Sequence, residues 1–556
     1  MPPRDPVTQL NTHEVTNQPP PLVDYNLYGG DSVLRDAVHR EGGGWADDKL
    51  SAFGAVLGRE STLALGANAN RYTPELRAFD RYGQRIDEVE FHPSYHELMA
   101  LGIEHQVHSI AWTAEQPGGH VVHTALEYLL TQVEAGVCCP LTMTNAAVPI
   151  LRRQPQLARE WESRVLSQHY DLRAVPIGEK RGATIGMAMT EKQGGSDVRA
   201  NTTRARALGA CDQGEAFALT GHKWFCSAPM SDAFFTLAYT DEGLSCFFVP
   251  RWHPDGSRNP ILIQRLKDKL GNRSNASSEI EYNDTWACLV GNEGEGVKTI
   301  LEMVHHTRLD TALAAAGLMR QAVVQAVHHA RYRRAFQKNL IDQPLMQNVL
   351  ADLTLEWLTA TIMIMRVARA YDETATSEEA GLFARLSVAV AKYWINKRLP
   401  QLVYEAMECL GGAGYVEESI LPRLYREAPL NSIWEGSGNV ICLDVLRTIE
   451  RSPAALEVFL AEVELAKGGD RRLDALVGEI RKTFASASQS NREQHARSLV
   501  EDLALAMEAS LVIRHMPGSI SSVFVESRLG TDRGHAFGTL PPGSAFTEII
   551  AHAQAS

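Results

Sequence analysis

The spacing of apolar residues changes twice along the chain. Up to about residue 181, apolar positions recur every three or four residues in segments such as HVVHTALEYLLTQVEAG, which is typical of amphipathic helices. From 182 to 290 the chain consists of short β-rich runs such as TIGMAMT, AFFTLAYT and LSCFFVP, separated by Gly, Asp, Asn and Pro. From 291 onward, long helical patterns return. The pattern therefore predicts an α+β protein in which strands lie between two helical segments.

These changes divide the chain into four expected segments. Residues 1–181 should form an extended arm and an all-α domain, and 291–450 a helical bundle. Residues 182–290 should form an antiparallel β domain, because their strand-like runs follow one another without intervening helices. After Arg447 the bundle pattern breaks at SPAA, so 451–556 should be a C-terminal helical extension, with a Pro/Gly-rich tail that has no evident core role.

The net charge and the cysteine content limit which binding partners and which cellular compartment are expected. A formal net charge of -13 argues against a protein that coats nucleic acid by bulk electrostatics, although a local basic patch is compatible with it. The eight Cys residues include no CxxC pair and no Cys-His spacing suited to zinc, so we expect a reduced, cytoplasmic setting and no metal site. The polar N-terminus and the lack of an apolar run of bilayer length predict neither export nor a membrane span.

A Gly-rich turn and a strand in the β segment carry candidate binding groups. In AMTEKQGGSDV (188–198) the glycines let backbone N–H groups approach a polar ring or phosphate, beside the hydroxyls of Thr190 and Ser196. In GHKWFCSAP an aromatic face at Trp224 and a hydroxyl at Ser227 are placed to flank a planar cofactor. An ordinary β-turn and a core Trp are the competing interpretations.

Glu435 is the candidate catalytic residue. It precedes a Gly and Ser turn in NSIWEGSGNV, ahead of the helical run VICLDVLR. A carboxylate at that position is suited to general-base catalysis, or it interacts with the positive end of the following helix. In HHTRLD, Arg308 is either a substrate contact or a structural partner of a carboxylate such as Asp310, and we favour the structural role.

Five separated motifs together resemble the acyl-CoA dehydrogenase family. They are the TExxxGSD turn, the KxWxx strand, the RxxF pair Arg333 and Phe336, the LGGAGY loop (410–415) and the EGxxN turn at Glu435. The segments TEKQGGSDVRANTTRA, RLKDKLGNRSNAS, EESILPRLYREAP and NSIWEGSGNVICLDVLR are similar to the AidB branch of that family in particular. The likeness extends over nearly the whole chain.

The resemblance implies the fold of that family, an FAD cofactor and a set of roles. Glu435 matches the catalytic base. Arg333 and Phe336 would reach the FAD of a neighbouring subunit, which implies a homotetramer built as a dimer of dimers. The residues that the resemblance assigns to FAD binding are Met189, Thr190, Ser196, Trp224, Phe225, Cys226, Ser227, Arg333, Phe336, Gly412, Ile433, Gly436, Ser437 and Asn439.

The resemblance also implies two functions that remain open at this point. One is an FAD-dependent oxidoreductase of the AidB type, linked to protection against DNA alkylation, that binds double-stranded DNA through the C-terminal segment and acts on an acyl-CoA or a small alkylating compound. Arg447 and Arg533 are then candidate phosphate contacts. The alternative is a metabolic dehydrogenase of short or branched acyl-CoAs without DNA binding, in which these arginines belong to a solvated helical face.

Overall fold

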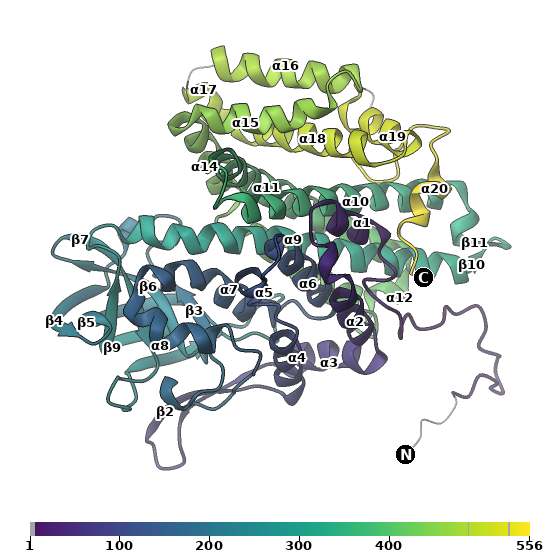
Figure 1. Cartoon of the computed structure of the whole chain (residues 1–556). Helices are drawn as coiled ribbons and strands as arrows, with labels where there is room; N and C mark the ends of the chain where they lie inside the picture. The colour runs from purple at the N-terminus through teal and green to yellow at the C-terminus, as the bar shows by residue number, and fades with distance from the viewer. Residues whose placement is uncertain (1–5, 487–488, 532–533, 556) are drawn as a thin grey trace.

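Three long helices cross the middle of the molecule and the other elements pack around them (Figure 1). The computed structural model describes residues 6–486, 489–531 and 534–555. One apolar cluster runs through the N-terminal helices, the long helices and the C-terminal helices, so these three parts share a core. The long helices are α9 (Gly296–Tyr332), α10 (Pro344–Glu373) and α11 (Glu378–Cys409).

The N-terminal segment contains helices that pack against α9 and α10. All 15 residues of α6 are buried, which makes it a core helix rather than a surface one. Residues 6–24 form an extended arm: Asn17 and Pro20 contact the end of α9 and the hairpin that follows it, and the residues before them lead away from the body of the fold (Figure 1). The helices are α1 (Ser32–Arg40), α2 (Asp47–Leu57), α3 (Glu60–Arg71), α4 (Pro93–Glu104), α5 (Ile110–Thr113), α6 (Gly119–Val133), α7 (Cys138–Arg153) and α8 (Pro155–Val165).

The prediction of an all-α N-terminal domain is wrong at one place, where β1 (Glu75–Phe79) and β2 (Arg85–Glu90) form an antiparallel hairpin. Its turn is closed by Asp80, whose carboxylate accepts hydrogen bonds from the backbone N–H groups of Tyr82 and Gln84. The sequence signal is the Asp-to-Gly turn between two short alternating runs.

Seven strands form a sheet that closes on itself. Most pairs are antiparallel, as predicted, but β3 pairs with β6 in parallel and β4 meets β6 by one parallel bridge. Neighbouring residues of one strand point to opposite faces, so Phe234 enters the interior cluster while Phe235 packs toward α7 and α8. The strands are β3 (Ile185–Ala188), β4 (Arg204–Cys211), β5 (Gly214–Ser227), β6 (Ala233–Thr240), β7 (Gly243–Pro250), β8 (Ile261–Leu266) and β9 (Ser277–Val290).

The C-terminal helices stack on one side of the long helices (Figure 1). The expectation that the C-terminal tail has no core role is wrong. Leu540, Ile549 and Ile550 are buried, and α20 packs on α10. The remaining elements are β10 (Arg334–Ala335), β11 (Lys338–Asn339), α12 (Gly412–Tyr415), α13 (Leu421–Glu427), α14 (Gly438–Arg451), α15 (Pro453–Val463), α16 (Arg471–Ser486), α17 (Gln489–Gln494), α18 (Ala496–His515), α19 (Gly518–Leu529) and α20 (Phe546–Ala551).

Helix α10 alone, among the described residues, is long and apolar enough to cross a bilayer by length and composition. This differs from the expectation that no segment reaches that length. However, 89% of its most apolar window is buried inside the fold. Such burial is what a core helix requires, so its composition is explained by packing.

Candidate active site

Glu435 lies in the turn that precedes α14, in a backbone conformation that few side chains adopt. Its φ is +55°, and that of the following Gly436 is +103°. A non-glycine residue in this left-handed region costs of order 1–3 kcal/mol, so its surroundings must hold it there. On the side of α9, Thr307 Oγ1 donates a hydrogen bond of 2.7 Å to Glu435 Oε2.

Two buried cations hold the backbone of this turn. Lys392 Nζ on α11 donates to the carbonyl oxygens of Trp434, at 2.8 Å, and Gly436, at 2.6 Å. Arg308 Nε on α9 donates to the carbonyl oxygen of Glu435 at 3.2 Å. Three consecutive carbonyl groups are therefore each held by a side chain from a long helix, which explains how the strained conformation persists.

Arg308 also forms an ion pair with a residue in the middle of α14. Its Nη1 donates to Asp444 on α14 at 2.6 Å, and Arg385 donates to both oxygens of the same carboxylate. Burial alone would raise the pKa of Asp444, but the charges of the two guanidinium groups outweigh this effect and lower the pKa to about 2. The favoured structural role of Arg308 is thus seen in its contacts, with Asp444 as the partner instead of Asp310.

Burial raises the pKa of Glu435, while the hydrogen bond from Thr307 and the charge of Lys392 act in the opposite direction. Burial also lowers the pKa of Lys392 to about 7, against the charge of Glu435. A carboxylate with a raised pKa is a stronger base than one in water. The arrangement is suited to accepting a proton from a bound molecule.

Cys139 marks the place where α7, the end of β5 and the Glu435 turn meet. Burial raises the pKa of its thiol to about 12, the charge of Lys269 and the hydroxyl of Ser227 oppose the rise, and the charge of Glu435 adds to it. Ser227 is within 3.3 Å of Ser277 on the paired strand β9. The predicted hydroxyl of β5 and the predicted base therefore lie in one neighbourhood.

The Gly-rich turn is fixed to β5 by a buried ion pair. Lys223 Nζ lies 2.9 Å from Glu191 Oε1, and neither side chain is exposed. The backbone N–H of Trp224 donates to the carbonyl oxygen of Thr190 at 2.7 Å. Burial raises the pKa of Glu191, but Lys223 and hydrogen bonds from neighbouring threonines bring it down to about 2. Thr190 and Ser196 are thereby presented beside the strand.

Consecutive residues of β5 point in different directions. Lys267 Nζ lies 3.2 Å from the centre of the Trp224 ring, so a cation covers this face of the indole. Phe225 is 47% exposed, whereas Cys226 is fully buried within the interior cluster of the sheet. Lys267 Nζ also lies 4.7 Å from the centre of the Phe225 ring, but Phe225 is the most exposed side chain of this run and so the one most accessible to a flat apolar ligand.

The remaining candidate residues are spread over the molecule. Ile433 is 63% exposed beside Glu435, Ser437 precedes α14, and Asn439 accepts a hydrogen bond from Arg497 of α18. Met189 is half-buried at the end of β3, and Gly412 is exposed at the start of α12. Arg333 and Phe336 lie at the β10–β11 hairpin, at the far end of α9 from the β domain (Figure 1). Arg447 is exposed on α14, and Arg533 lies outside the described residues.

Three family models match consecutive parts of the chain. The N-terminal domain of the adaptive response protein AidB matches residues 17–172, the acyl-CoA dehydrogenase middle domain matches 186–285, and the acyl-CoA dehydrogenase C-terminal domain matches 294–450. The chain belongs to the acyl-CoA dehydrogenase family. Within that family it is of the AidB type, and it is an FAD-dependent flavoprotein of the class that oxidises CH–CH bonds.

Individual relatives agree over almost the whole length. The chain is 46% identical over 525 residues to the putative acyl-CoA dehydrogenase AidB of Escherichia coli, covering 94% of this chain and 95% of the relative. It is 30% identical to acyl-CoA dehydrogenase family member 11 of Caenorhabditis elegans, covering 85% and 78%. The crystal structure of C. elegans ACDH-11 in complex with C11-CoA has a TM-score of 0.84 and 27% identity, covering 94% of each chain. The predicted fold class is confirmed.

The residues around Glu435 fit a flavin. Phe225 and Ile433 are large apolar side chains exposed beside the turn and the strand, which suits a planar ring system. The hydroxyl of Ser274 is buried without a hydrogen-bond partner among the described residues, and the buried amide of Asn275 has only the thiol of Cys139 as a polar side-chain neighbour there. Buried polar atoms of this kind are normally satisfied, so they suit the polar edge of a bound group.

Sequence reasoning missed the residues that hold the site. Thr307 and Lys392 read as ordinary positions of amphipathic helices, and Lys223 as a polar position of a strand. Their partners lie 128, 42 and 32 residues away in the sequence. Only the fully apolar surroundings of Lys392 in α11 could have suggested a buried lysine with a partner.

Proposed function

We propose that Glu435 is the catalytic base of an acyl-CoA-dehydrogenase-type reaction. The observation that carries this proposal is the set of hydrogen bonds that fix Glu435 in place. Its carboxylate accepts a hydrogen bond from Thr307, and the carbonyl oxygens of its turn accept hydrogen bonds from Arg308 and Lys392. These hydrogen bonds keep the carboxylate in one orientation, which proton abstraction requires.

In this proposal Glu435 removes the proton α to the carbonyl of a thioester. FAD, when bound, would supply the redox chemistry as the acceptor of a hydride from the β-carbon. The proton remains on Glu435 Oε1, the oxygen that does not accept from Thr307. The backbone of the 188–198 turn, together with Thr190 and Ser196, would hold the polar parts of the cofactor. Phe225 and Ile433 would cover its ring and exclude water.

The other assigned contacts are part of the same proposal. Gly436 lets the backbone approach the ring, and Ser437 and Asn439 close the site from the start of α14. Cys226, whose side chain points into the sheet, would contribute through its backbone. Trp224 would support the site from the opposite face of the strand, and Met189 and Gly412 would contribute backbone contacts.

Anaerobic mixing with a panel of short, straight and branched acyl-CoAs tests the proposal. A substrate should bleach the flavin absorbance, and Glu435→Gln should slow bleaching at least about a thousandfold, as expected for loss of a general base. FAD content of the variant should be unchanged. A variant that bleaches at the original rate contradicts the role of Glu435, and the absence of bleaching with every thioester contradicts the substrate class.

We further propose a homotetramer in which Arg333 and Phe336 reach the FAD of a neighbouring subunit. Phe336 is 92% exposed and has a φ of +50°, so the hairpin presents an aromatic side chain that this chain does not cover. Light scattering should give four chains per particle. Phe336→Ser should lower FAD content and the fraction of tetramer together, and a monomer that retains full FAD content contradicts this assignment.

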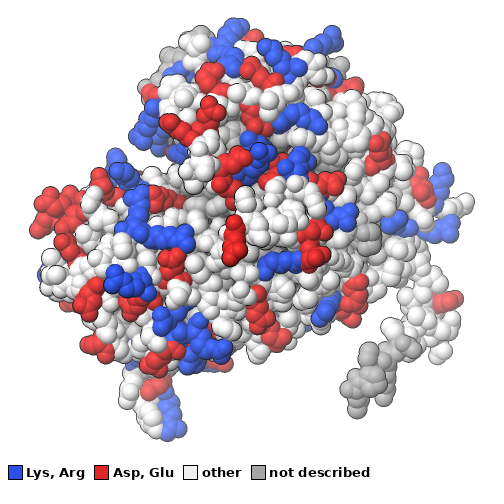
Figure 2. Space-filling model, viewed as in Figure 1, with Lys and Arg blue, Asp and Glu red and all other residues white. Residues whose placement is uncertain are grey.

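For cellular function, the AidB-type relationship supports protection against DNA alkylation, with double-stranded DNA bound by the C-terminal helices. On the face shown in Figure 2, Lys and Arg side chains are scattered over these helices at the top, with Asp and Glu among them. Arg447→Ala should weaken duplex binding and reduce its salt dependence by about one ion. Duplex binding that is unchanged in Arg447→Ala contradicts the assigned contact, and complete absence of duplex binding favours a purely metabolic dehydrogenase.

A further inference from the structure

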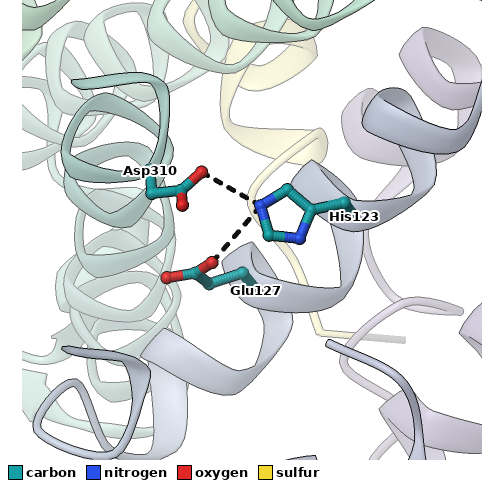
Figure 3. Close-up of side chains that lie close together, drawn as sticks. All are labelled: His123, Glu127 and Asp310. Atoms are coloured by element: carbon teal, nitrogen blue, oxygen red, sulfur yellow. Dashed lines mark hydrogen bonds and ion pairs between the residues drawn. The ribbon is translucent and has the colours of Figure 1, made fainter. Parts of the chain in front are cut away.

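Behind the candidate active site, three buried side chains from two helices turn toward one point. His123 and Glu127 lie one turn apart on α6, and Asp310 faces them from α9 (Figure 3). One nitrogen of the imidazole and one oxygen of each carboxylate lie within 4.8 Å of one another. All three side chains are at most 1% exposed.

The hydrogen bonds around His123 leave Nε2 as the nitrogen that faces the carboxylates. Its Nδ1 lies 2.6 Å from the carbonyl oxygen of Val107, which can only accept, so Nδ1 carries a proton. Trp112 Nε1 donates to Asn145 Oδ1, which turns the amide nitrogen of Asn145 toward Nε2 at 3.3 Å. Nε2 also lies 3.0 Å from Asp310 Oδ1, to which it donates a hydrogen bond when the imidazole is protonated. An ion at this point would replace that proton, and an imidazole whose Nδ1–H donates to a carbonyl oxygen is the usual arrangement of a metal-binding histidine.

The two carboxylates also offer lone pairs without a donor. Thr142 has one hydroxyl proton, which it donates to Glu127 Oε1, so Glu127 Oε2 has no hydrogen-bond partner among the described residues and contacts only His123 Nε2, at the longer ion-pair distance of 3.6 Å. Asp310 Oδ2 has the Thr142 hydroxyl as a neighbour, but that hydroxyl donates its one proton to Glu127, so Oδ2 is also left without a donor. Ionised carboxylates buried in this way cost several kcal/mol unless a cation compensates them.

The spacing suits a metal ion. His123 Nε2 is 3.0 Å from Asp310 Oδ1 and 3.6 Å from Glu127 Oε2. Ligands that surround one ion tetrahedrally at 2.0–2.2 Å are separated by about 3.4 Å. The charged guanidinium of Arg308, on the same helix as Asp310, is already used by Asp444 and the Glu435 turn.

We propose that His123, Glu127 and Asp310 form a buried site for one divalent transition-metal ion, bound by Nε2 and one oxygen of each carboxylate. One imidazole and two carboxylates suit Zn²⁺, Mn²⁺ or Fe²⁺ rather than a soft ion. The ion neutralises two carboxylate charges and joins α6 to α9. Helix α9 also carries Thr307, one turn before Asp310, so the ion braces the helix that orients Glu435. No metal ligand was expected from the sequence, because the three residues are separated by up to 187 positions.

Protons on His123, Glu127 and Asp310 compete with a metal ion for this cluster. The pKa of Glu127 is raised to about 8 by burial, and burial also raises that of Asp310. Burial works against a charged His123, but the neighbouring carboxylates raise its pKa to about 9. Other titratable groups interact electrostatically with members of the cluster: His108, His120 and His306 with His123, Tyr371 and Glu435 with Asp310, and Cys138 with Glu127. His120 and His306 have lowered pKa values because of burial, so they remain neutral.

Metal analysis of the purified full-length FAD-bound protein, after dialysis against Zn²⁺, Mn²⁺ or Fe²⁺ and gel filtration, tests the proposal. We expect about one ion per chain, and none in the double variant Glu127→Gln, Asp310→Asn. His120→Gln is the matched control, a nearby buried histidine whose replacement should leave the ion in place. The unfolding midpoint of the original chain should fall after metal removal and recover on its return, whereas that of the double variant should not respond.

Less than about a tenth of an ion per chain, both in protein as purified and in protein refolded with each metal, overturns the proposal. So does a nitrogen NMR spectrum in which both ring nitrogens of His123 are protonated at neutral pH in the presence of metal. Metal content does not depend on thioester oxidation, so these outcomes are independent of the proposed reaction. If the double variant fails to fold, Glu127→Gln alone, which keeps an oxygen for Thr142, serves with the same readout.

Discussion

Thr307 Oγ1 and Glu435 Oε2 are joined by a hydrogen bond of 2.7 Å that crosses from the first long helix to the turn before α14. A donor on an ionised carboxylate stabilises the charged form by about 1.5–3 kcal/mol. This bond therefore counteracts the effect of burial on Glu435.

Thr307→Val should raise the pKa of Glu435 by roughly one unit or more, because the carboxylate loses its donor while the shape of the side chain is preserved. The measurement is the pH dependence of flavin reduction by an acyl-CoA, whose acidic limb should move to higher pH. Thr307→Ser retains the hydroxyl and is the control. An unchanged acidic limb in the valine variant would show that the hydrogen bond does not tune the base.

Lys392→Met should misplace the base rather than remove it. The carbonyl oxygens of Trp434 and Gly436 lose their donor, and the strained φ of Glu435 loses part of its support. We expect a loss of about 2–3 kcal/mol in the free energy of unfolding and slower flavin reduction, with FAD still bound. Lys298→Met, at an exposed position of α9, is the control. Equal effects of the two substitutions would contradict the assigned role.

The motif residues of the site were predictable because they lie close together in the sequence. Thr190 and Ser196 share one turn, and Glu435 to Asn439 share another, so each set carries a local signature. Their supports have no such signature. Lys392 and Thr307 acquire their roles only when α9 and α11 pack around the Glu435 turn, and helical periodicity indicates that a residue faces inward but not which partner it meets.

The fold was predicted to the extent that one period dominated each segment. The hairpin at Glu75–Phe79 and Arg85–Glu90 was missed because two short strands lie between much longer helical patterns. The parallel pair β3–β6 was missed because strand order along the chain does not specify which strands become neighbours. Burial of Ile549 and Ile550 by α10 likewise depends on tertiary packing.

The Glu191–Lys223 pair should stabilise the Gly-rich turn strongly because both charges are buried. Removing one partner with Lys223→Met or Glu191→Gln should cost about 3–5 kcal/mol in the free energy of unfolding, since the other charge is left uncompensated. Replacement of both should cost less than the sum of the two. Denaturant unfolding of the two single variants and the double variant checks this, and additive effects would show that the pair does not act as a unit.

The same pair should contribute to acid sensitivity. The pKa of Glu191 is about 2 in the folded protein, below the ordinary value of 4.5. The folded state therefore binds fewer protons than the unfolded state between these values, and stability is lost as pH falls through that window. Glu191→Gln should flatten this part of the stability profile, measured by unfolding at pH 2–5. A steep loss that persists in the variant would assign the acid sensitivity to other carboxylates.

Glu508 should produce the opposite pH dependence. It is buried between α10 and α11, where Trp394 Nε1 donates to its Oε2 and Thr359 Oγ1 lies 3.3 Å from its Oε1. Burial and the charge of Glu356 raise its pKa to about 8. Because the folded state keeps a proton that the unfolded chain releases above pH 4.5, this group destabilises the fold increasingly as pH rises toward 8.

Glu508→Gln should therefore flatten the decline in unfolding midpoint between pH 5 and pH 8, since an amide accepts the same hydrogen bond from Trp394 without titrating. The variant and the original chain should be most alike near pH 5, where Glu508 is protonated in the folded state, and the variant should be the more stable at pH 8. Glu501→Gln, on the same helix but half-exposed, is the control. A decline of equal slope in the Glu508 variant would show that this carboxyl group is ionised throughout the range.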